Sequence, residues 1–166
     1  MSECRVRAMR PQDRYEVAEL ICRYPYRMKR RTDKNLGRSE GEIDILLLDT
    51  MGELTGVIAS SDVTFLGGSL VPGIGGHNVL EAAAQNKPVL FGPHMENFPD
   101  ISRELMETGG GFMVRDAWEI ARRAIQFLTD TEAREDAGRC AMEVVENNRG
   151  AARRTLKAIE PLMGEG

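Results

Sequence analysis

Short apolar runs alternate with longer amphipathic segments along most of this chain. The apolar runs suit buried strands and lie at residues 44–49, 62–66, 88–91 and 112–114, with a weaker candidate at 5–9. Strands that alternate with helices predict an α/β fold, in which helices cover both faces of a parallel sheet. Such folds bind ligands at the carboxyl ends of their strands, so we expect chemistry in the loops after Asp49, Leu66 and Phe91.

The segments between the strand candidates have the apolar periodicity of helices. One face of the first expected helix carries Val17, Leu20, Ile21 and Tyr24. Further helices are expected at residues 51–60, 78–85, 98–107, 132–146 and 151–162. Another begins after Asp116, a good N-cap residue, and one face of it carries Trp118, Ala121, Ile125 and Leu128. The polar residues 31–42 are expected to form a surface loop.

Composition places the chain among ordinary globular proteins. It has 166 residues, 42% of them hydrophobic and 29% charged, and we expect one domain over residues 1–166. Its net charge of -4 argues against a nucleic-acid partner, which normally requires a basic surface. The cysteines at positions 4, 22 and 140 fit neither a disulfide framework nor a CxxC metal site, which favours the cytoplasm. No apolar run reaches the roughly 20 residues of a membrane span, and the polar start lacks the core of a signal peptide.

The most informative segment is the glycine-rich loop at residues 67–78, which runs from a strand end into an expected helix. Glycines leave backbone N–H groups exposed, and a helix start at Asn78 would add converging donors. The loop therefore predicts an anion site. The candidate phosphate-binding residues are Gly68, Ser69, Gly75, Gly76 and His77.

Glu81 lies about one turn into the helix that follows this loop. Its carboxylate could accept hydrogen bonds from two ribose hydroxyls, and phosphate and ribose together indicate a nucleotide. The alternative interpretation is a mobile surface loop before a helix that carries a solvated glutamate.

Several sharper motifs are excluded by their spacing. Asn78 stands where the third glycine of a dinucleotide G-x-G-x-x-G would lie, and no P-loop G-x-x-x-x-G-K-[ST] occurs. Ser69 lacks the second glycine of a hydrolase G-x-S-x-G. His77 and His94 are the only histidines and have no carboxylate or thiolate at ligand spacing, so a metal site is not expected.

These motifs together resemble the carboxyl-terminal domain of bacterial 3-deoxy-D-manno-octulosonic acid (Kdo) transferases over roughly residues 8–163. The segments that carry the resemblance are 49–54 (DTMGEL), 67–72 (GGSLVP), 75–81 (GGHNVLE), 87–94 (KPVLFGPH), 97–98 (NF) and 148–151 (NRGA). The resemblance implies a Rossmann-like domain, a parallel sheet with helices on both faces, as one half of a glycosyltransferase B architecture.

The resemblance also implies the substrate and the site. CMP-Kdo would be the donor and a lipid A precursor the acceptor, during lipopolysaccharide assembly at the cytoplasmic face of the inner membrane. No cofactor and no metal are implied. The implied CMP contacts are Met9, Arg10, Met51, Gly52, Glu53, Asn78, Val79, Leu80 and Glu81.

By this resemblance the amino-terminal domain, with the acceptor site and the general base, lies outside the chain, so we expect no catalytic residue here. We expect the chain to bind CMP or CMP-Kdo but not to transfer sugar by itself. Without its first strand the sheet would have an open edge, through which copies could form a homo-oligomer. Two alternatives stay open: a stand-alone, non-catalytic nucleotide-binding or interaction domain, and a transferase that uses another sugar nucleotide.

Overall fold

The computed structural model describes residues 25–33 and 43–150. The chain divides into two compact units, Met1–Val57 and Ile58–Gly166. The strand expected at 5–9, the helix after it and the helix expected at 151–162 lie outside the described residues. The prediction of one domain over the whole chain stays a prediction.

The first unit contains two short parallel strands, β1 (Met28–Arg30) and β2 (Ile45–Leu47), with Met28 opposite Ile45. Asp44 fixes their start, because its carboxylate accepts hydrogen bonds from the backbone N–H of Arg27 at 2.7 Å and from its Nε at 3.1 Å. Strand β2 lies inside the strand predicted at 44–49. The prediction that this strand is buried is wrong: Leu46 is 46% exposed, and among the described strands β2 pairs only with β1.

The second unit is built on a parallel sheet in the order β3-β4-β5, formed by Thr64–Leu66, Val89–Phe91 and Gly111–Met113. All of β4 is buried, as expected for the central strand of a sheet that is covered on both sides. The predicted strands at 62–66 and 88–91 are confirmed. The strand predicted at 112–114 begins one residue earlier, at Gly111.

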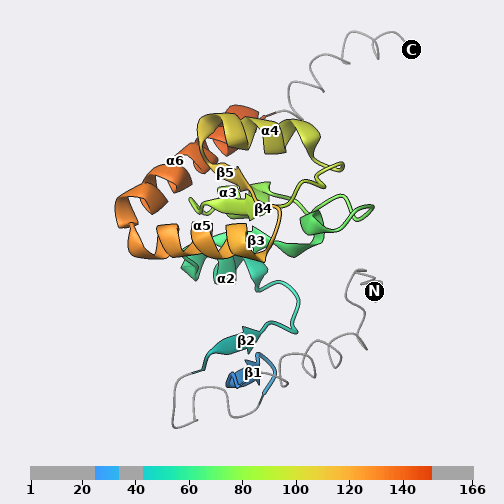
Figure 1. The fold of residues 1–166 in the computed structure, drawn as a ribbon, viewed down its shortest axis with the longest axis vertical. Coiled ribbons are helices and arrows are strands. Elements are labelled where there is room, and N and C mark those ends of the chain that lie inside the picture. Colours follow the sequence, from blue (N-terminus) through green and yellow to red (C-terminus); the bar gives the residue numbers. More distant parts are fainter. Residues whose placement is uncertain (1–24, 34–42, 151–166) are drawn as a thin grey trace, which may run out of the picture. The chain divides into compact units, whose positions relative to one another are not determined.

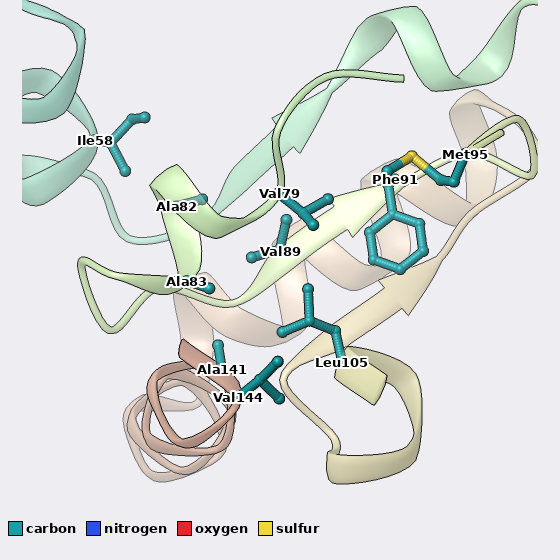
Figure 2. Close-up of a cluster of buried hydrophobic side chains, with 10 residues drawn as sticks. All are labelled: Ile58, Val79, Ala82, Ala83, Val89, Phe91, Met95, Leu105, Ala141 and Val144. Carbon is teal, nitrogen blue, oxygen red and sulfur yellow. The ribbon is translucent and has the colours of Figure 1, made fainter. Parts of the chain in front are cut away.

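Helices cover both faces of this sheet, as predicted (Figure 1). Val89 and Phe91 lie in one core with residues of α3 (Leu80–Ala83), α4 (Pro99–Thr108) and α6 (Thr131–Asn148) (Figure 2). Leu90, between them in sequence, lies in the other core with Phe127 of α5 (Ala117–Thr129). Alternate side chains of one strand therefore hold helices on opposite faces.

The helix ends follow the local sequence. Asp116 caps α5 by accepting a hydrogen bond from the Glu119 N–H at 2.8 Å, as predicted. Asp130 caps α6 in the same way through the Ala133 N–H at 3.0 Å. Helix α4 ends at Gly109, whose φ of +83° is left-handed, and the Gly110 N–H then donates to the Leu105 carbonyl.

Helices α2 (Leu54–Ser60) and α5 differ from expectation. Helix α2 begins after Met51 because Gly52 has a φ of +85°, which no helical residue adopts. On α5, the predicted apolar face is the exposed one: Trp118 is 76% exposed and Leu128 is 55% exposed, whereas Phe127 is 1% exposed. Within residues 25–33 and 43–150, no helix has both the length and the hydrophobicity that crossing a membrane requires.

Candidate functional site

The carboxyl ends of β3 and β4 carry two loops that contact each other. One is the glycine-rich loop, which begins with the 3-10 turn η1 (Gly67–Leu70) and leads to α3. The other, residues 92–98, connects β4 to α4. Parallel neighbouring strands end at the same edge of a sheet, and here the His94 N–H donates to the Ser69 carbonyl at 2.9 Å.

Ser69 joins these loops from the inside. Its side chain is fully buried; the hydroxyl donates to the Leu66 carbonyl at 2.5 Å and accepts from the Gly92 N–H at 2.6 Å. A Cβ at Gly92 would lie 2.3 Å from the Ser69 carbonyl oxygen, so only glycine fits there. Both hydrogen bonds of the Ser69 hydroxyl are thus made to the main chain of the protein. Ser69 therefore shapes the loop, and its side chain does not face a ligand.

A bend of two glycines forms the outer part of the loop. Gly75 and Gly76 both have left-handed backbones, with φ of +77° and +71°. A Cβ at Gly75 would lie 2.5 Å from Nδ2 of Asn97, and one at Gly76 would lie 2.5 Å from Sδ of Met95. The left-handed backbone favours glycine at both positions, and any side chain there would also have to displace Asn97 or Met95.

This bend presents free backbone donors. No described residue supplies an acceptor to the N–H groups of Gly75, Gly76 or His77. Gly75 and Gly76 are buried residues, and buried N–H groups normally have partners. Successive N–H groups in a turn can form a concave site for an anion. The exposed His77 lies beside them, with Nδ1 3.1 Å from where a Cβ of Gly68 would be.

Helix α3 is shorter than predicted. It covers Leu80–Ala83 rather than residues 78–85, and the Asn78 side chain accepts from the Leu80 N–H at 3.1 Å. The predicted helix start at Asn78 is therefore wrong, while a contribution of this segment to anion binding stays a prediction. The loop N–H groups remain as donors.

Two side chains at the start of α3 have different environments. Glu81 is exposed in its first turn and has no hydrogen bond or ion pair with any described residue, so its carboxylate is available. Val79 is completely buried in the core. Its side chain therefore belongs to the core and presents no surface to a ligand.

In the first unit, two carboxylates follow β2. Asp49 accepts from the Thr32 N–H at 3.1 Å and from its hydroxyl at 2.6 Å. Glu53 accepts from Arg31 Nε at 3.0 Å and from the Thr50 hydroxyl. Both carboxylates are thus engaged by side chains of their own unit.

These contacts change the acidity of Glu53. The hydrogen bond from the Thr50 hydroxyl, and secondarily the positive charge of Arg31, lower the pKa of Glu53 below its ordinary value. We expect Thr50→Val to raise that pKa towards the ordinary value, because the largest cause of the shift is removed. Thr50→Ser, which keeps the hydroxyl, should leave the pKa low. Carbon-13 NMR titration of the Glu53 carboxyl measures both; an equally low pKa in the valine variant would contradict the assignment.

Comparison with known proteins finds Kdo transferases among the relatives of this chain, although no protein-family model matches it. The 3-deoxy-D-manno-octulosonic acid transferase of Haemophilus influenzae is 38% identical over 148 residues, which cover 89% of this chain and 34% of that protein. The protein of the same name from Bordetella pertussis is 36% identical over 134 residues, 81% of this chain and 31% of that protein. The chain spans about a third of the length of these curated relatives.

A solved structure also matches the fold, and the match covers a larger share of that chain than of the curated relatives. It is the C-terminal CMP-Kdo binding domain of WaaA from Acinetobacter baumannii, with a TM-score of 0.73 and 32% identity, over 82% of this chain and 69% of that one. This chain belongs to the Kdo transferase family. The α/β fold predicted from the resemblance, one half of a glycosyltransferase B architecture, is thereby confirmed.

The site residues predicted from the Kdo transferase resemblance fall into separate groups. Met9 and Arg10 lie outside the described residues. Met51, 91% exposed, and Gly52 form a bend before α2 in the first unit. Asn78 to Glu81 follow the glycine-rich loop in the second unit, together with the candidate phosphate residues.

Sequence reasoning missed Asn97 and the partners of Glu53. Asn97 stands in one of the segments that resemble Kdo transferases, which was a usable signal, but nothing local indicates that it contacts residues 74 and 75. The sequence places Arg31 and Thr32 in a surface loop. It does not predict β1 before them, because two of the three residues of β1, Lys29 and Arg30, are charged and lack the apolar pattern of a strand. Their contacts with Glu53 and Asp49 depend on the pairing of β1 with β2.

Proposed function

We propose that the second unit of this chain binds the nucleotide of CMP-Kdo. The observation that carries the proposal is the set of backbone N–H groups from Gly75 to His77 without an acceptor among the described residues. Main-chain donors of this kind suit a phosphate, because they carry partial positive charge and need no side chain to become ordered. In the proposal they hold the CMP phosphate, with His77 at their side.

Glu81 would hold the ribose. Its exposed carboxylate has no partner among the described residues and can accept hydrogen bonds from two neighbouring hydroxyls. The name of the Acinetobacter baumannii domain supports CMP-Kdo as the ligand class. Met9, Arg10 and residues 51–53 stay proposed CMP contacts through the family resemblance alone.

We further propose that the whole protein of which such a domain is part transfers Kdo to a lipid A precursor, in lipopolysaccharide assembly at the cytoplasmic face of the inner membrane. An acceptor hydroxyl would bond to the anomeric carbon as the bond from that carbon to the CMP phosphate breaks, and the hydroxyl proton would pass to a general base. Charge grows on the departing phosphate, where the loop N–H groups would stabilise it.

No metal or other cofactor takes part in this proposal, so EDTA should leave CMP affinity unchanged.

Calorimetric titration of the purified chain with CMP tests the binding function, with UMP as the comparison ligand. We expect CMP to bind more tightly than UMP, and Glu81→Gln to weaken CMP binding about tenfold, as befits the loss of charge-assisted hydrogen bonds. The effect should be smaller for 2′-deoxy-CMP, which lacks one of the hydroxyls that Glu81 would hold.

Glu107→Gln is the matched control, because Glu107 is an exposed glutamate on α4 outside the site and its replacement removes the same charge. Its CMP affinity should equal that of the unchanged protein. Equal weakening in both variants would reduce the role of Glu81 to a long-range charge effect. Absence of CMP binding in the unchanged protein would refute the proposed function.

A further inference from the structure

Asn97, in the loop after β4, hydrogen-bonds to the main chain of the Gly75–Gly76 bend. The Asn97 backbone N–H donates to the Gly75 carbonyl at 3.1 Å, and its side-chain Nδ2 donates to the Ile74 carbonyl at 3.3 Å. The carboxamide also occupies the space beside the Gly75 Cα, because a Cβ there would lie 2.5 Å from Nδ2, 2.7 Å from Cγ and 2.9 Å from Oδ1. One residue thus fixes two consecutive carbonyls and the face of the glycine between them.

The orientation of these carbonyls fixes the orientation of the free donors. The Ile74 carbonyl and the Gly75 N–H belong to one planar trans peptide, in which they point in opposite directions. The same holds for the Gly75 carbonyl and the Gly76 N–H. When Asn97 holds both carbonyls on its side, it turns the N–H groups of Gly75 and Gly76 away from itself. These are two of the N–H groups that have no acceptor among the described residues.

We propose that Asn97 is a positioning residue for the donor phosphate: it sets the Gly75–Gly76 bend so that both N–H groups point at the ligand. This inference rests on the proposed function. Asn97 is an exposed residue, so its side chain adds little to the core, unlike the neighbouring Met95, which is buried in the same core as Phe91 (Figure 2). Its hydrogen bonds serve the shape of the loop.

Titration with CMP and with cytidine separates this role from general destabilisation. Asn97→Ala should weaken CMP binding about fivefold to tenfold, the loss expected for one hydrogen bond that holds the loop. Cytidine, which has no phosphate, should bind Asn97→Ala and the unchanged protein equally. Asn97→Asp, which keeps the size but replaces the donor with a second acceptor, should weaken CMP binding at least as much. Equal losses for CMP and cytidine would overturn the proposal.

Asn148→Ala is the matched control. Asn148 also donates from Nδ2 to a main-chain carbonyl, that of Val144, but at the carboxyl end of α6. Its replacement should leave the affinities for CMP and cytidine unchanged. A weakening of CMP binding alone that matched Asn97→Ala would contradict a specific role for Asn97.

Amide hydrogen exchange of the ligand-free protein provides a readout that does not depend on nucleotide. Asn97→Ala should shift the Gly75 and Gly76 amide resonances and speed exchange of the residue-97 amide, which donates to the Gly75 carbonyl, while the amides of β4 keep their protection. Unchanged glycine resonances would overturn the proposal even if CMP binds. If the unchanged protein binds no CMP, the proposed function fails and the phosphate role of Asn97 with it, while the exchange data still show whether Asn97 holds the bend.

Discussion

Gly138→Ala should destabilise the second unit by about 2 to 3 kcal/mol, although alanine normally stabilises a helix relative to glycine. Gly138 lies inside α6, where the helix meets the turn between α3 and β4. A Cβ at this position would lie 2.1 Å from the Asn86 carbonyl oxygen and 2.8 Å from its carbon. Both atoms are main chain, so no side-chain rotation relieves the contact. Asn86 itself has a φ of +55°, which leaves this turn little freedom to move.

Gly56→Ala is the control for that prediction. Gly56 lies in α2, and nothing lies within 4 Å of where its Cβ would be. Here the usual preference applies, and we expect alanine to stabilise the protein by about 0.5 to 1 kcal/mol. Guanidinium unfolding followed by circular dichroism measures both changes. A Gly138→Ala protein as stable as Gly56→Ala would show that α6 does not approach Asn86 this closely.

Phe127→Ala should cost about 3 to 5 kcal/mol, the largest effect that we expect from one substitution. Phe127 is almost fully buried on α5, in one core with Leu90 of the central strand, and its ring centroid lies 5.1 Å from that of Phe112. Truncation would leave a cavity between α5 and the sheet. This cavity cannot close without moving the helix, because the interior is close-packed.

Leu128→Ala, one position further along α5, should change stability by less than about 0.5 kcal/mol, because Leu128 is largely exposed. The same denaturation experiment compares the two variants. This pair also tests which face of α5 is inward, since the sequence pattern placed Leu128 on the apolar face. A greater loss in Leu128→Ala than in Phe127→Ala would reverse that orientation.

The order of strands and helices in the second unit was predictable because each boundary has a local cause. Asp116 begins α5 through a hydrogen bond to a residue three positions later, and Gly109 ends α4 through its left-handed backbone. The face of α5 was not predictable from spacing. Ile120, Ala124 and Phe127 also recur at helical spacing, beside the stripe that begins at Trp118, and only the packing partners decide which stripe turns inward.

The candidate site was predictable in part. Glycine content and position after a strand indicated the anion loop, and the family resemblance indicated Glu81. The inward hydroxyl of Ser69 and the grip of Asn97 could not be derived, because both contacts depend on β3 and β4 lying side by side. Helix α3 was predicted too long, because the apolar pattern over residues 78–85 does not reveal where the helix begins and ends. Asn78, outside the helix, accepts from the Leu80 N–H, and the last turn closes at Ala83.

The loops 67–78 and 92–98 must be engineered together, because the Ser69 hydroxyl accepts a hydrogen bond from the Gly92 N–H and the close approach of the two main chains leaves no room for a side chain at Gly92. If only residues 67–78 were replaced by the corresponding loop of a related protein, the new loop would lack the main chain of residues 92–98 against which it packs. It would also lose the asparagine that sets its outer bend. Attempts to exchange nucleotide-sugar preference within this fold should therefore graft residues 67–78 and 92–98 together, and select variants at one segment only in combination with the other.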